Sequence, residues 1–381
     1  MTRQDSDLHL VHVVRQYRPS IGGLEDFVAS LAARQKDRFA SVRIVTCDRV
    51  FRGGTGETLP ARESIDGIEV IRLPWHGSTR YPVTPGIFKA IAGAGLVHVH
   101  AIDFFFDALA LASPIHRRPL VATTHGGFFH SGTAGGLKTV WFNTLTRLSA
   151  TAYRGIACCS QSDYERFATI APSKVRLIEN GVDLSKLGDA GAKAPAKGIV
   201  SIGRLSQNKR IDRVLDAYAV LARRDPEWTL DIVGAPFDWS AKDVEAMIAE
   251  RGLTGRARLH VGLNDTAMRE IASRASLFAS ASVYEGFGIA LIEAMSAGLV
   301  PVVEPNAAFS AFAQRHPGIT LTDFSDAEQA AGALAAAHAR LSGNPQGLRE
   351  EVMAVAQTYS WESTAERYAA FYREALGSSA R

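Results

Sequence analysis

The sequence predicts an α/β protein made of two domains, each built on a parallel sheet. The chain has 381 residues, which is more than one hydrophobic core usually serves. Short segments rich in β-branched residues alternate with helical segments, as they do in parallel α/β sheets. This alternation restarts at residues 198–203, after a stretch rich in Ala, Gly and Lys. We therefore expect a first domain at 1–183, a linker at 184–197, a second domain at 198–358 and a terminal helix within 359–381.

The expected elements follow from hydrophobic periodicity. In the first domain, a strand, a loop and a helix are expected at residues 8–14, 15–23 and 24–37. Further strands of this domain are expected at 42–46, 68–73, 96–100, 120–124, 156–159 and 175–178. In the second domain, a helix is expected at 211–224, with strands at 198–203, 230–233, 258–261, 277–279 and 300–303. The tail predicts an amphipathic helix at 359–376 that carries Trp361, Tyr368, Phe371 and Tyr372.

Composition favours a cytoplasmic protein. Apolar residues make up 46% of the chain and charged residues 21%, which is typical of soluble globular proteins. The polar start, Met1 to Asp7, does not resemble a secretory signal, and no apolar run approaches the roughly 20 residues of a membrane-spanning helix. The cysteines, Cys47, Cys158 and Cys159, lack metal-type spacing and fit a reducing compartment.

Positive charge is concentrated in the first half. Residues 1–180 contain 21 Lys and Arg against 15 Asp and Glu, whereas the remainder contains 21 against 24. A basic half is suited to an anionic membrane surface or a diphosphate-linked acceptor, although scattered, solvated arginines fit the count equally well. No basic cluster is dense enough to indicate a nucleic acid partner.

The most informative motif is a pair of acids, Glu285 and Glu293, eight positions apart. Between them, Gly286, Phe287 and Gly288 form a turn that leads into an apolar helix. The ionised Glu293 is costly in such surroundings unless a ligand or side chain donates hydrogen bonds to it. A hydroxyl-rich ligand such as a sugar nucleotide would do so, and the N–H groups at the helix start suit its phosphates.

Two cations, Arg204 and Lys209, follow directly on the strand that ends at Gly203. Arg can bind phosphate oxygens in a forked geometry, and Lys supplies a movable point charge. Loop cations are usually solvated, but together with the acidic motif this pair indicates a diphosphate site. Such cations would stabilise a leaving nucleoside diphosphate as its negative charge develops.

Weaker candidates lie at other strand ends of the first domain. Gly22 and Gly23 occupy the first strand-to-helix loop, and His125 ends a strand before a glycine pair. Asp103 lies at the rim of a strand, where it could contact an acceptor hydroxyl. Ser160 occupies a similar strand end, and capping of the next helix explains it equally well.

A metal site is an alternative reading of His98 and His100. A strand places both histidines on one face, which approaches a metal-hydrolase pattern with the nearby Asp103. The aspartate falls one position too late for that pattern, so we expect no metal. A metal hydrolase would lose its activity to chelators.

Taken together, these motifs resemble those of retaining glycosyltransferases of family four. The resemblance spans nearly the whole chain and includes Gly22-Gly23, His125-Gly126, residues 180–183 (Asn-Gly-Val-Asp), residues 203–209 (Gly-Arg-x4-Lys) and the paired acids. Within that family, residues 12–23, 98–106 and 124–130 are similar to the exopolysaccharide α-mannosyltransferases.

The resemblance implies a GT-B fold, in which two Rossmann-like domains face each other across a cleft and a C-terminal helix packs back on the N-terminal domain. It implies transfer of α-mannose from GDP-mannose to a polyprenyl-diphosphate-linked cellobiosyl acceptor in exopolysaccharide biosynthesis. Configuration would be retained and no metal cofactor needed. The enzyme would lie peripherally on the inner face of a bacterial cytoplasmic membrane.

The resemblance also implies roles for individual residues. Arg204 and Lys209 would bind the donor diphosphate, and Glu293 the ribose hydroxyls. Glu285 would contact the sugar hydroxyls, with His125 near the reactive carbon. The remaining positions would support donor or acceptor: Gly22, Gly23, Gly286, Phe287, Gly288, Asp103 and Ser160.

Two alternatives keep the predicted fold. One is a transferase that uses a UDP-sugar in lipopolysaccharide or capsule assembly, with base choice resting on the loops at 234–239 and 261–265. The other is a non-catalytic scaffold of a polysaccharide assembly complex. Parallel assays with labelled donors would separate the first alternative from mannose transfer. A scaffold predicts that Lys209→Ala and Glu293→Ala leave the polysaccharide output of cells unchanged.

Overall fold

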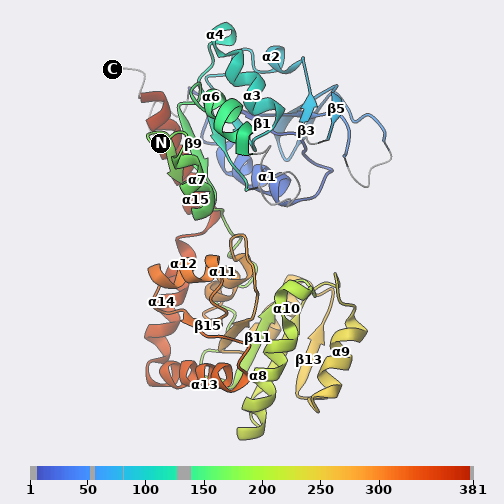
Figure 1. Ribbon diagram of the computed structural model, residues 1–381, viewed down its shortest axis with the longest axis vertical. Coiled ribbons are helices and arrows are strands. Elements are labelled where there is room, and N and C mark those ends of the chain that lie inside the picture. The colour runs from blue at the N-terminus through green and yellow to red at the C-terminus, as the bar shows by residue number, and fades with distance from the viewer. Residues whose placement is uncertain (1–6, 52–55, 80, 127–138, 378–381) are drawn as a thin grey trace. The chain divides into compact units, whose positions relative to one another are not determined.

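The computed structural model describes residues 7–51, 56–79, 81–126 and 139–377. The chain divides into two compact units, each with its own sheet and helices (Figure 1). The first unit comprises Met1–Gly181 together with Trp361–Arg381, and the second comprises Val182–Ser360. The terminal helix is therefore grouped with the N-terminal unit. Within the described residues, no helix is long and apolar enough to cross a membrane.

The sheet of the first unit has eight strands in the order β10-β9-β8-β7-β1-β2-β4-β3. All neighbours are parallel except β3 and β4. The strand bounds are β1 His9–Val13, β2 Ser41–Cys47, β3 Arg62–Ile65, β4 Ile68–Leu73, β7 Leu96–His100, β8 Leu120–Thr123, β9 Gly155–Cys158 and β10 Val175–Leu177. The seven strands expected from the sequence all form. The unexpected ones are β3, which is short and mostly exposed, and a separate hairpin of β5 (His76–Ser78) and β6 (Tyr81–Val83).

Helices cover this sheet, and two of them, α3 and α7, begin where a short polar residue follows a strand. Asp103 accepts a hydrogen bond from the backbone of Phe105, and Ser160 accepts one from Asp163, so both are helix N-caps. The helical segments among the described residues include α1 Gly23–Gln35, α2 Ile87–Ala90, α3 Phe104–Leu111, α4 Ser113–His116, the π-helix η1 Phe142–Thr146, α6 Arg147–Ala150, α7 Gln161–Ala168 and α15 Trp361–Gly377.

Helix α15 packs into the first unit through its aromatic face. Trp361, Tyr368, Phe371 and Tyr372 are buried in the same core cluster as Phe27 of α1. At the surface, Arg34 of α1 pairs with Glu362 of α15, and Arg38, in the turn after α1, pairs with Glu366 of α15. Exposed ion pairs contribute little, so the buried aromatic side chains account for most of the attachment.

The sheet of the second unit has six parallel strands in the order β13-β12-β11-β14-β15-β16. Their bounds are β11 Gly198–Ile202, β12 Thr229–Val233, β13 Ala257–His260, β14 Leu277–Ser280, β15 Val300–Val303 and β16 Thr320–Leu321. The helices are η2 Gln207–Lys209, α8 Ile211–Arg224, α9 Ala241–Glu250, α10 Asp265–Ala272, α11 Ile289–Ser296, α12 Ala307–Arg315, α13 Ala327–Gly343 and α14 Pro345–Gln357. Helix α8 has the bounds that its apolar spacing predicts.

The stretch at 184–197, expected to be a linker, instead packs on the second unit. Leu187 is fully buried, and the backbone N–H of Asp189 donates to the carbonyl of Ser296. A Cβ on Gly191 would lie 2.6 Å from the carbonyl oxygen of Ala297. The small residues that suggested flexibility thus permit close packing of backbone on backbone.

The contact between Gly155 and Phe371 offers a test of how α15 is held. A Cβ on Gly155 would lie 2.5 Å from Cε2 of Phe371, so Gly155→Ala should destabilise the protein by about 1–3 kcal/mol. The cost should shrink in a Phe371→Leu background, because the clashing ring is gone. Urea unfolding gives these values. Gly332→Ala, which meets nothing within 4 Å, is the matched control, and equal costs in both backgrounds would contradict the packing.

Candidate active site

The loop that carries Glu285 runs from the end of β14 to the start of α11. Gly288 precedes the helix with φ 92°, a conformation that favours glycine, and a Cβ there would lie 3.0 Å from Cε1 of Phe309. The half-buried Phe287 packs near Phe312 and Tyr359, with ring centroids 5.7 and 6.0 Å away. Phe287 therefore anchors the turn that leads into α11. The first backbone N–H groups of a helix have no partner within the helix and can donate to a ligand.

Lys209 and Glu285 meet directly. The ammonium Nζ of Lys209 donates to Oε1 of Glu285 over 2.5 Å, and both side chains are largely buried. Asn208 fixes the two loops together, because its side chain donates to the carbonyl of Tyr284 and accepts from the N–H of that residue. A Cβ on Gly203 would lie 3.1 Å from Cε of Lys209, so the glycine leaves room for the lysine stem.

Glu293 lies on α11 with its side chain mostly buried and paired with a second cation. Nζ of Lys186 donates to Oε1 of Glu293 over 3.2 Å. Burial raises the pKa of Glu293 above its usual range, and Lys186 opposes that rise. Lys186 was not among the residues expected from the sequence, although its position just after the Asn-Gly-Val-Asp motif at 180–183 was an available signal.

Arg204 takes a different partner. Its guanidinium carbon lies 4.5 Å from the ring centroid of Phe237, which follows β12 in one of the loops expected to contact the donor base. This cation–π contact holds an exposed arginine at the strand end. The structure thus brings Lys209 to Glu285 and gives Arg204 and Glu293 partners of their own within the same unit.

The first-unit candidates also lie at strand ends. His125 follows β8 with φ 52°, and its ring contacts Phe27 edge-on at 4.6 Å between centroids. Burial, with a contribution from the charge of Arg15, lowers the pKa of His125 to about 3. Gly22 precedes α1 and Gly23 begins it. Of the segment at 124–130 that resembles the mannosyltransferases, residues 127–130 lie outside the described part of the chain.

Asp103 and Ser160 both act as helix caps. For Ser160, capping of α7 accounts for the residue, because its Oγ accepts a hydrogen bond from the N–H of Asp163. Asp103 differs because it is buried and its Oδ2 has no hydrogen-bond partner among the described residues. Burial raises the pKa of Asp103 to about 7, opposed by the charge of Arg15. A carboxyl group of this kind can hold or release a proton near neutral pH.

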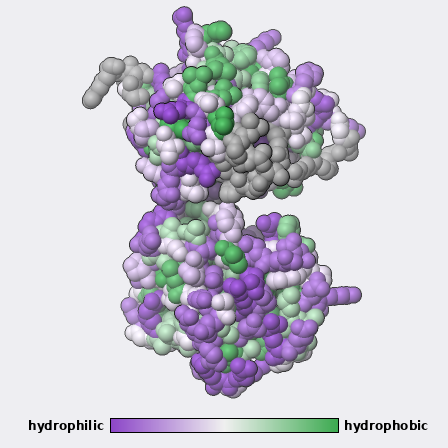
Figure 2. Space-filling model, in the orientation of Figure 1, coloured by the Kyte–Doolittle hydropathy of each residue, from purple (hydrophilic) through white to green (hydrophobic). Residues whose placement is uncertain are grey.

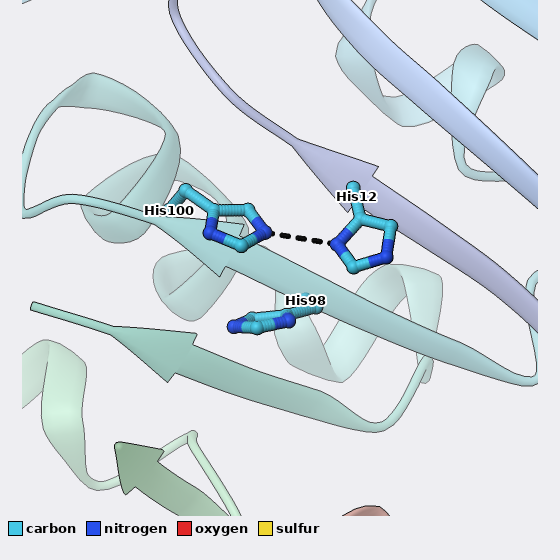
Figure 3. Close-up of side chains that lie close together, drawn as sticks. All are labelled: His12, His98 and His100. Atoms are coloured by element: carbon cyan, nitrogen blue, oxygen red, sulfur yellow. Dashed lines mark hydrogen bonds between the residues drawn. The ribbon is translucent and has the colours of Figure 1, made fainter. Parts of the chain in front are cut away.

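Three buried histidines, His12, His98 and His100, gather beneath these strand ends (Figure 3). One ring nitrogen of each lies within 4.8 Å of the others, which is close enough for a metal ion. All six ring nitrogens already have hydrogen-bond partners: His12 with Gln35 and His100, His98 with Tyr372 and Thr123, and His100 with His12 and His125. A metal would have to break these bonds, so the geometry favours a hydrogen-bonded network.

Comparison with solved structures identifies the fold. The structure is similar to that of Anabaena HepE in complex with UDP, with a TM-score of 0.69, 19% identity, and coverage of 95% of this chain and 98% of HepE. It is also similar to a glycosyltransferase from Rickettsia africae, with a TM-score of 0.69, 16% identity, and coverage of 97% and 99%. The fold is therefore GT-B, with two Rossmann-like domains.

Sequence comparison gives the family. Residues 21–186 match the model "Glycosyltransferase Family 4", and residues 189–340 match "Glycosyl transferases group 1". Two similar proteins are named GDP-mannose:cellobiosyl-diphosphopolyprenol alpha-mannosyltransferase. The one from Komagataeibacter xylinus is 38% identical over 98% of this chain and 95% of its own, and the one from Xanthomonas campestris is 39% identical over 97% and 98%. The chain belongs to glycosyltransferase family 4.

The raised pKa of Glu293 predicts a pH-dependent stability difference. Because its folded-state pKa lies above the unfolded value of about 4.3, ionisation of Glu293 lowers stability as pH rises from that value through the folded pKa. Glu293→Gln has no such ionisation, so its stability relative to the parent should improve as pH rises above about 4 and through the folded-state pKa. Urea midpoints measured across this range test the sign. Parallel profiles for the two proteins would contradict it.

Proposed function

We propose that this protein is a retaining α-mannosyltransferase that transfers mannose from GDP-mannose to cellobiosyl-diphosphopolyprenol in exopolysaccharide biosynthesis. The proposal draws on relatives of that name that match nearly the full chain. In the structure, the observation that carries it is the contact between Lys209 and Glu285 at the start of α11. A lysine ammonium, a carboxylate and the backbone N–H groups at a helix start provide complementary groups for a sugar diphosphate.

The ion pair explains how donor binding would be accommodated. A diphosphate oxygen competes with Glu285 for the ammonium of Lys209, which frees Oε1 of Glu285 to accept hydrogen bonds from sugar hydroxyls. Neither charge is then left buried and unpaired, which would cost several kcal/mol. The buried Glu293, held by Lys186, is suited to accept hydrogen bonds from the ribose hydroxyls in the same way.

In the reaction, the bond between the mannose anomeric carbon and the diphosphate oxygen breaks, and a bond to the acceptor oxygen forms on the same face. The acceptor hydroxyl proton passes to the departing phosphate oxygen. Lys209 and Arg204 would stabilise the negative charge that develops on that diphosphate. We propose that no metal ion is needed, because these cations and the N–H groups before α11 supply the positive potential.

We further propose that the protein works in the cytoplasm, attached to the inner face of a bacterial membrane. The first unit carries exposed apolar side chains around α3, α4 and α6, visible as green areas over these helices in Figure 2. This apolar patch consists of Leu111, Ile115, Val140, Trp141 and Leu148. The exposed Arg117 and Arg147 lie beside it in the chain. Apolar side chains flanked by cations fit a surface of anionic lipid, where the lipid-linked acceptor resides.

Donor and residue specificity can be tested together. With labelled donors offered in parallel, we expect transfer from GDP-mannose, and we expect Lys209→Ala and Glu285→Ala to lower kcat/KM by about 10²–10³ because transition-state charge loses its stabilisation. Lys242→Ala, at an exposed lysine of α9, is the matched control. Transfer only from a UDP-sugar would refute the donor assignment. Polysaccharide output in cells that Lys209→Ala leaves unchanged would favour a scaffold instead.

Membrane attachment can be tested by flotation with phosphatidylglycerol vesicles. We expect salt-sensitive binding, which Leu111→Glu with Ile115→Glu should weaken on the order of tenfold or more, because apolar contact is lost and negative charge is added. Leu321→Glu adds one carboxylate, against two in the patch variant, at an exposed apolar residue of the second unit and should leave binding intact. Equal binding by the patch variant and this control would refute the assigned surface.

A further inference from the structure

A continuous hydrogen-bonded chain connects α1 to His125 through the interior of the first unit. Oε1 of Gln35 lies 2.8 Å from Nε2 of His12, and Nδ1 of His12 lies 2.9 Å from Nε2 of His100. Nδ1 of His100 lies 3.0 Å from Nε2 of His125. Figure 3 shows the middle link, between the rings on β1 and β7. Gln35, His12 and His100 are all fully buried.

The imidazoles of this chain are neutral. Burial lowers the pKa of His12 to about 4 and that of His100 well below its usual value. A neutral imidazole has one N–H donor and one bare nitrogen acceptor. A ring that donates at one nitrogen must therefore accept at the other, which fixes the direction of the next hydrogen bond in the chain. The whole chain can therefore run in only two ways, and the group at its inner end decides which.

Gln35 is that group. Its carboxamide oxygen can only accept, so Nε2 of His12 donates and Nδ1 of His12 accepts from His100. By the same logic, Nδ1 of His100 accepts from Nε2–H of His125. His125 then carries its proton on Nε2 and leaves Nδ1 as a bare acceptor.

A second branch is consistent with this orientation of the Gln35 amide. Its Nε2 donates to the hydroxyl of Tyr372 over 3.3 Å, and that hydroxyl lies 2.7 Å from Nδ1 of His98. Nε2 of His98 lies 2.7 Å from Oγ1 of Thr123. The tyrosine accepts from the amide and donates to His98, so both branches have consistent directions. Helix α15, which carries Tyr372, thereby takes part in fixing the network.

We propose that Gln35 is a positioning residue which, through His12 and His100, fixes His125 as the tautomer with a bare Nδ1 that accepts a hydrogen bond from a hydroxyl of the transferred sugar. The tautomer follows from the network alone, and the sugar contact rests on the proposed function. A buried chain of rings is costly unless every polar atom is paired, so a break at Gln35 propagates to His125.

The tautomer can be read by long-range ¹H–¹⁵N NMR of the full chain labelled with ¹⁵N-histidine, with His125→Phe used to assign the signals. We expect a bare Nδ1 and a protonated Nε2 on His125. A protonated Nδ1 in the parent protein would overturn the proposal. Gln35→Met, which cannot accept from His12, should mix the two tautomers, whereas the isosteric Gln35→Glu keeps an acceptor and should preserve the parent pattern. An unchanged His125 spectrum in Gln35→Met would also overturn it.

The sugar contact is tested with singly deoxygenated GDP-mannose donors. Deoxygenation at one position should lower kcat/KM by about 2–10-fold for the parent and leave His125→Phe unaffected, as expected for one lost hydrogen bond. Equal losses in both proteins at every position would refute the contact. The NMR measurement needs no donor and therefore does not depend on the proposed function. If the protein showed the expected His125 tautomer but transferred no mannose, the proposed function would fail and the inference about the tautomer would stand.

Discussion

The placement of functional side chains depends on one constraint, the burial of both faces of a parallel sheet. Such strands are almost continuously apolar, so polar groups gather where the strands end. Lys209 follows β11, Glu285 follows β14 and His125 follows β8. Each unit thus presents its chemistry at the carboxyl edge of its own sheet. Inside the sheet, polar residues persist only where partners satisfy them, as His12, His98 and His100 show.

This constraint also explains how much could be predicted from the sequence. Apolar runs separated by turn residues located every strand of the two sheets except β3 and β16, and helical spacing located α8 at its observed bounds. The strands that were missed, β3, β5, β6 and β16, are short, lie at edges or in a hairpin, and are mostly exposed. Their sequences therefore lack the burial signal that marks a central strand. Composition misled at 184–197, because small residues suit close packing as well as flexible linkers.

The hydrogen-bond and ion-pair partners of the site residues were harder to predict than the positions of those residues along the sequence. The motifs located Lys209, Glu285 and Glu293, but no spacing rule indicates that Lys186 pairs with Glu293 across 107 positions of sequence. The histidines on β7 suggested a metal when read by alternation alone. The structure adds His12 from β1 and Gln35 from α1, and these residues complete a network of hydrogen bonds. Such long-range pairing is set by tertiary packing, which a single sequence does not display.

The two units differ in the charge state of their functional groups, which are ionised in the second unit and neutral in the first. The second uses ion pairs, Lys209 with Glu285 and Lys186 with Glu293, whose charges suit a diphosphate and a nucleotide. The first uses neutral imidazoles, and the charge of Arg15 further lowers the pKa of His125. Under the proposed function, this contrast has a chemical reason. Positive charge develops on the sugar as its anomeric bond breaks, and a protonated histidine beside that carbon would oppose the step, whereas a neutral acceptor orients a hydroxyl without repelling the charge.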